Sequence, residues 1–87
     1  DRFDGQRSVA TARMYLFDMT ERLFARKTPE LAEAIRNDLR EARDVDAMLE
    51  VAHRLLHTIE ETAGSERANA IRERLAKLLP THSLAIN

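Results

Sequence analysis

Apolar residues recur three and four positions apart between residues 45 and 63, and this pattern constrains the fold more than any other part of the chain. Its members are Val45, Met48, Leu49, Ala52, Leu55, Leu56, Ile59 and Ala63. This spacing places side chains on one face of an α-helix, whereas a half-buried strand would alternate at every second residue. We therefore expect an amphipathic helix whose apolar face packs against other helices.

Three further segments show helical spacing, and every Gly and Pro residue except Gly5 lies at a helix boundary. We expect these helices from Ser8 to Arg26, from Pro29 to about Arg43, and from Ser65 to Leu79, with Pro80 stopping the last. Thr28 precedes Pro29 and is expected to cap the second helix. Gly64 suits the end of the helix before it, and Ser65 is expected to cap the final helix.

The sequence leaves open whether residues 29–63 form one helix or two. Asp44 suits a helix cap, and the segment Asp44-Val45-Asp46 has weak helix propensity. No Gly or Pro intervenes, however, and the apolar spacing continues from Ala42 to Leu49. We favour a break near Arg43 over one long helix.

The length of the chain allows one small helical domain spanning residues 1–87. With 87 residues and no cysteine, neither disulfides nor cysteine-bound zinc can supplement the core. We therefore expect an all-α fold of three or four antiparallel, bundle-like helices that oligomerisation or a partner completes. Residues 1–7 are expected to form a polar leader and residues 81–87 a mobile tail. Because the chain begins at Asp1, we interpret it as a piece of a longer protein.

The charge and hydropathy patterns argue against two classes of partner. The formal net charge is −1, which does not favour binding to nucleic acid or to an anionic membrane. A modest basic edge alternates with acids, in the order Arg36, Asp38, Arg40, Glu41, Arg43 and Asp44. No apolar run approaches the roughly 18 residues of a membrane span, and no signal peptide is visible. We expect a cytoplasmic protein that binds neither nucleic acid nor a membrane.

The first expected helix is apolar around an unusually large part of its circumference. Its apolar residues form two neighbouring stripes, with Tyr15 on the other flank, and cover an arc of roughly 220°. Such a helix needs partners on two sides, so it is either central in the fold or part of a subunit interface. Aromatic residues and Met are enriched in interface cores, which makes Met14, Tyr15, Phe17 and Phe24 our interface candidates. The alternative is that Phe17 and Phe24 fill the chain's own core.

Two histidines, His53 and His57, lie one helical turn apart. They lie roughly 100° and 140° from the centre of the apolar face, so we expect both to be exposed. Two imidazoles and a nearby carboxylate fall short of four tetrahedral zinc ligands. The residue after His53 is Arg54, so the H-E-x-x-H zinc-protease motif is not present. We expect no metal and no cofactor.

The residues around these histidines resemble a known motif. Ala52-His53-Arg54-Leu55 is similar to the start of the A-H-x-L-K-G-like motif of histidine phosphotransfer (HPt) domains. Residues 57–64 are similar to its H-T-L-K-G-S-A-G form. The Lys-Gly pair of the motif is replaced by Leu56-His57 in the first alignment and by Glu60-Glu61 in the second.

The HPt resemblance extends to the order of helices from Leu31 to Leu79. It implies a small helical bundle whose exposed His53 or His57 accepts a phosphoryl group. It also allows a degenerate bundle of that shape that is not phosphorylated.

No complete catalytic motif occurs in the chain, so we expect a protein that is not an enzyme. The wide apolar arc and the small size favour a non-catalytic, regulatory helical module for oligomerisation or protein–protein interaction. Its partner would be itself, as a homodimer or higher oligomer, or another protein. The alternative is histidine phosphotransfer in two-component signalling.

Overall fold

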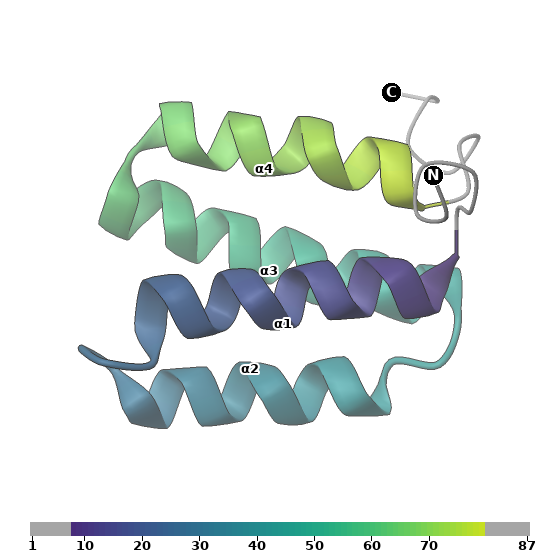
Figure 1. Cartoon of the computed structure of the whole chain (residues 1–87), viewed down its shortest axis with the longest axis horizontal. Coiled ribbons are helices and arrows are strands. Elements are labelled where there is room, and N and C mark those ends of the chain that lie inside the picture. Colours follow the sequence, from purple (N-terminus) through teal and green to yellow (C-terminus); the bar gives the residue numbers. More distant parts are fainter. Residues whose placement is uncertain (1–7, 80–87) are drawn as a thin grey trace.

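A computed structural model describes residues 8–79, which form an antiparallel bundle of four helices (Figure 1). The helices are α1 (Val9–Phe24), α2 (Pro29–Glu41), α3 (Val45–Ala63) and α4 (Ser65–Leu78). Residues 8–79 contain no strand, so the expected all-α, bundle-like fold is confirmed. None of these four helices is long and apolar enough to cross a membrane. The expected leader 1–7, the tail 81–87 and Pro80 lie outside the described residues.

Residues 29–63 form two helices, as we favoured. The backbone of Ala42 is extended, with φ −79° and ψ 108°, which ends α2. Asp44 then caps α3, because its carboxylate accepts a hydrogen bond from the backbone N–H of Ala47 at 2.8 Å. This bond satisfies one of the backbone donors that the first turn of a helix leaves unpaired.

Arg13 of α1 also contributes to this break. Its Nε donates to the carbonyl oxygen of Leu39 at 2.9 Å, and its Nη2 donates to that of Ala42 at 2.5 Å. The last carbonyls of a helix have no intrahelical donor and carry partial negative charge. A guanidinium from a neighbouring helix therefore closes α2 and ties it to α1.

Thr28 takes the expected cap position of α2 without the expected capping bond, and the expected cap at Ser65 is wrong. Thr28 precedes α2, but its side chain makes no capping bond, because its hydroxyl donates instead to the carbonyl oxygen of Phe24 at 3.2 Å. The residue before α4 is Gly64, and Ser65 is already the first residue of the helix. With φ +96° and ψ 159°, Gly64 makes the reversal in a single residue, which leaves Ser65 no capping position.

One apolar cluster runs through the bundle, and α3 provides a large part of it. The buried residues of α3 are Met48, Val51, Ala52, Leu55, Leu56 and Ile59. The apolar pattern between residues 45 and 63 is thus mostly internal. Val45 and Leu49 are partly buried, and Ala63 is exposed near the end of the helix. The pattern missed Val51, which widens the buried face.

The wide apolar arc of α1 is largely covered within the chain, because α1 packs against α2, α3 and α4 (Figure 1). Ala12, Leu16 and Phe24 are buried in the core. The backbone N–H of Ser8 also donates to the carbonyl oxygen of Leu78 at 2.8 Å, which joins the start of α1 to the end of α4. Of the two explanations for the arc, central packing in the fold accounts for most of it.

Charged side chains connect the surfaces of neighbouring helices. Arg36 of α2 forms ion pairs with Glu21 of α1 and, at 2.8 Å, with Glu33 of its own helix. Arg54 of α3 lies 3.5 Å from Asp38 of α2 and does not form the pair with Glu50 that its spacing allows. These pairs are solvent-exposed on at least one side, so each contributes little to stability.

Candidate interaction surface

The structure separates the four interface candidates of α1. Phe24 is 3% exposed and belongs to the core, so it is not accessible to a partner. Phe17 is partly buried, and the guanidinium of Arg40 from α2 lies 5.8 Å from the centroid of its ring. This cation–π contact covers the ring from within the chain. Phe17 and Phe24 therefore serve mainly the packing of the bundle.

Met14 and Tyr15 lie on a different side of α1, beside α4. Met14 is 59% exposed, and it is the only large hydrophobic side chain classed as exposed in residues 8–79. Both residues border an open hollow of about 230 Å³ between the two helices. The hollow is lined by Thr11, Met14, Tyr15, Asp18, Arg74 and Leu78. We call these six residues the α1–α4 surface.

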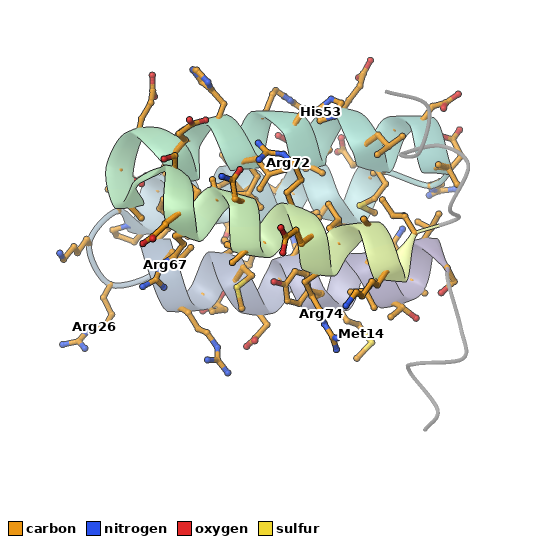
Figure 2. All side chains as sticks on the ribbon, turned by 90° about the horizontal axis from the view of Figure 1, so that it is seen from above. Met14, Arg26, His53, Arg67, Arg72 and Arg74 are labelled. Atoms are coloured by element: carbon orange, nitrogen blue, oxygen red, sulfur yellow. The ribbon has the colours of Figure 1, made fainter. Side chains whose placement is uncertain are left out.

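The α1–α4 surface has an apolar centre and a charged rim. Figure 2 shows Met14 and Arg74 projecting side by side from α1 and α4. Burial raises the pKa of the Tyr15 phenol above its usual value. Arg74 acts in the opposite direction and lowers this pKa, whereas Asp18 raises it further. Tyr15 is therefore a neutral phenol around pH 7, and it can donate a hydrogen bond but is a poor base.

The helical spacing of α1 identified Met14 and Tyr15, but it could not identify Arg74. This residue is 59 positions from Tyr15 in the chain, and only the packing of α4 on α1 brings the two together. A signal was present in the composition of α4, whose charged residues include the exposed cations Arg67, Arg72, Arg74 and Lys77. Spacing within one helix does not show which groove each of them borders.

The two histidines are exposed, as expected, and they differ in their surroundings. His57 Nε2 lies 3.3 Å from Glu61 Oε2 on the same helix. His53 borders a second hollow, of about 280 Å³, between α3 and α4. Arg72 of α4 lines the same hollow, and Figure 2 shows His53 and Arg72 on the side of α4 that faces α3. Residues 8–79 contain no group of three His, Asp or Glu that could hold a metal ion.

The basic edge of α2 is largely engaged within the chain. Arg36 is held by Glu21 and Glu33, and its side chain is 22% exposed. Arg40 donates to Asn37 Oδ1 at 2.7 Å and covers the ring of Phe17. Of the three arginines of this edge, Arg36 and Arg40 thus contact other side chains of the bundle.

Comparison of the chain with models of protein families, with curated proteins and with solved structures finds no match in any of the three. The surfaces of the bundle itself are therefore what indicates a function.

Proposed function

We propose that this chain is a non-catalytic helical module that binds a protein, either a second copy or a different chain, through the α1–α4 surface. The main observation in support of this proposal is that Met14 is exposed. An unbranched, polarisable side chain adapts to different partners, and Met is enriched in the cores of interfaces. The adjacent hollow can receive an apolar side chain from the partner.

The rim of the α1–α4 surface supports the same function. Asp18, Arg74 and Thr11 surround the apolar centre with groups that can orient a partner, as in interfaces with a buried core and a polar edge. A stable interface covers about 800 Å² on each partner, so the hollow would be only its centre. The neutral state of Tyr15 suits a hydrogen-bonding contact better than proton transfer.

The test is binding by a chain with Met14→Glu. Analytical ultracentrifugation over a wide concentration range measures self-association, and we expect the variant to weaken it. The matched control is Ala34→Glu, which makes the same kind of change at an exposed position of α2 away from this surface. Circular dichroism checks that both variants remain folded.

Strictly monomeric behaviour would exclude self-association. A different partner is then sought by affinity capture and mass spectrometry. We expect a protein retained by the wild type and by Ala34→Glu but lost with Met14→Glu. If neither self-association nor capture depends on Met14, the proposal is wrong.

A second candidate function, histidine phosphotransfer, is favoured by the position of Arg72. The HPt motif has a Lys near its histidine, and this chain lacks that Lys. Arg72 borders the hollow beside His53 and would supply positive charge for a phosphoryl group from the neighbouring helix. His57 is less suited, because Glu61 lies beside it and would repel phosphate.

This second candidate is tested by incubating the chain with a phosphorylated response-regulator domain. The phosphoryl group would pass from the aspartyl phosphate to a ring nitrogen of His53. We expect an acid-labile phosphate that is lost with His53→Ala and retained with His57→Ala. Lack of labelling, or labelling that survives the substitution of both histidines, would exclude phosphotransfer.

A further inference from the structure

The end of the bundle where the α1–α2 loop approaches the α3–α4 turn contains a third and larger hollow. Its volume is about 730 Å³. It is lined by Arg22, Leu23, Phe24, Arg26, Lys27, Thr28, Leu31, Thr62, Ala63 and Arg67. Figure 2 shows Arg26 and Arg67 at this same end, away from Met14 and Arg74. We call these ten residues the loop-end hollow.

The charge around the loop-end hollow is of one sign. Four cations line it, and no acidic residue does. Arg22 is paired with Asp18 at 3.0 Å. Arg26, Lys27 and Arg67 are exposed, and within residues 8–79 none of them forms an ion pair with an acid.

Acidic residues occur nearby, but they do not enter the hollow. Glu30 and Glu66 lie in the first turns of α2 and α4, and Glu60 and Glu61 lie in the last turn of α3. None of the four is among the lining residues. The hollow itself therefore presents positive charge, although the chain as a whole has a net charge of −1.

The floor of the loop-end hollow is apolar. Leu23 and Leu31 line it and are partly buried, and Phe24, which also lines it, is 3% exposed. Both helices that begin at this end, α2 and α4, lack a side-chain capping bond, whereas α1 and α3 at the opposite end have one. Glu30 and Glu66 lie in these first turns and offset part of their partial positive charge, so the attraction for an anion comes mainly from Arg26, Lys27 and Arg67.

We propose that the loop-end hollow binds an acidic peptide segment that carries an apolar side chain. Carboxylates of the segment would pair with Arg26, Lys27 and Arg67, while its apolar side chain would lie over Leu23 and Leu31. Arginine forks match carboxylates with two parallel hydrogen bonds. This surface is separate from the α1–α4 surface, so the proposal does not depend on the function proposed above.

The dimensions and exposure of the hollow favour a peptide over other anions. A single small anion would be held by exposed, flexible side chains, and an exposed ion pair contributes little by itself. An extended chain engages several cations at once and also fills the apolar floor. Single-stranded nucleic acid typically gains affinity by stacking bases on accessible aromatic rings, and Phe24, the one aromatic residue that lines the hollow, is buried.

The test is binding of a short synthetic peptide of Asp and Glu around a central Leu-Leu pair, measured by calorimetry and by amide chemical shifts. We expect shifts at the loop-end hollow and affinity that falls with added salt. Replacing the acids by Asn and Gln should abolish binding. Replacing Leu-Leu by Ala-Ala should weaken it, because apolar burial is lost.

Charge reversal locates the site. The double variant Arg26→Glu with Arg67→Glu should lower the affinity for the peptide by about tenfold or more, since two attractions become repulsions. The matched control is Arg43→Glu with Arg72→Glu, which changes net charge equally at exposed positions outside the hollow and should bind within about twofold of the wild type. If the first variant does not fold, Lys27→Gln with Arg67→Gln makes a milder change.

Three outcomes would overturn the proposal. One is that the acidic peptide fails to bind the wild type. Another is that both double variants weaken binding equally, which would indicate general charge attraction. The third is that single-stranded oligothymidylate binds more tightly than the peptide with the same dependence on Arg26 and Arg67, which would make this a nucleic-acid site.

Discussion

At the scale of single residues, Arg13 has a role that local sequence does not reveal. It belongs to α1, yet its guanidinium binds the carbonyl oxygens of Leu39 and Ala42 at the end of α2. The two acceptors are 26 and 29 positions away in the chain. A helical pattern shows that Arg13 lies beside the apolar stripe, but it cannot show which carbonyls it meets.

We expect Arg13→Ala to lower the free energy of unfolding by about 1.5–3 kcal/mol, because bonds from a charged donor to unpaired helix carbonyls are lost. Urea denaturation measures this change. Arg22→Ala is the control: its ion pair with Asp18 is exposed, and its loss should cost at most about 0.5 kcal/mol. Equal effects of the two substitutions would show that the capping bonds of Arg13 do not stabilise the fold.

Tyr15 is the single tyrosine of the chain, so the absorbance of its phenolate reports its titration directly. Burial raises its pKa above 10.0 in the folded protein. We expect Arg74→Ala to raise this pKa further and Asp18→Asn to lower it, since the two charges act in opposite directions. The same midpoint in the folded chain and in the urea-unfolded chain would contradict the assigned burial.

The raised pKa of Tyr15 also predicts the direction of a pH effect on stability. The folded state favours the neutral phenol, so this contribution is fully present below the unfolded pKa and is lost as the pH rises through the folded value. Stability measured by urea denaturation should therefore fall above about pH 10. The part of this fall that comes from Tyr15 should be missing in Tyr15→Phe.

At the scale of elements, the connection from α3 to α4 depends on Gly64. Its φ of +96° with ψ of 159° lies in a region that is almost exclusive to glycine. A Cβ at this position would meet no atom within 4 Å, so any cost of a side chain arises from the backbone alone.

We expect Gly64→Ala to destabilise the chain by about 1–3 kcal/mol through this backbone strain. Ser65→Ala should change stability by at most about 0.5 kcal/mol, because Ser65 is inside the helix and forms no capping bond. Thermal and urea unfolding of the two variants test the pair. A larger loss with Ser65→Ala would restore Ser65 as the cap that its sequence position suggested.

The elements also show where local sequence is sufficient. Asp44 ended the ambiguity over residues 29–63 through a bond to Ala47, three positions away, so the signal for the break was local. Thr28 carried an equally good local signal for a cap, but its hydroxyl bonds to Phe24 in the preceding turn. The sequence allows the Thr28 hydroxyl either to cap α2 or to bond back to Phe24. The path of the α1–α2 loop selects the second.

At the scale of the whole molecule, one apolar cluster joins all four helices. We expect a single cooperative unfolding transition, with helix content and tertiary signals changing together. Leu16→Ala should remove about 2–5 kcal/mol of stability, because Leu16 is fully buried and its loss leaves a cavity. Met14→Ala, two residues earlier on the exposed side of α1, should have little effect.

Calorimetry and denaturation followed by two probes check these expectations. Separate transitions for helix content and for tertiary packing would mean that a partly folded state with helices but without fixed packing is populated, and would contradict a single cooperative transition. A loss of stability with Met14→Ala as large as that with Leu16→Ala would show that Met14 is a core residue and not an exposed contact.

The sequence by itself determined the helical class and the exposure of His53 and His57, because both follow from spacing within one helix. It favoured two helices over one in residues 29–63 but left the choice open, and the structure decided it through the Asp44 cap and the bonds from Arg13 to the end of α2. Tertiary structure decided which part of the wide apolar arc of α1 is covered, leaving Met14 exposed and burying Phe24. It also brought Arg74 to Tyr15 and Arg26 to Arg67. These contacts join residues far apart in the chain, and their positions depend on how whole helices pack, which periodicity within one helix does not contain.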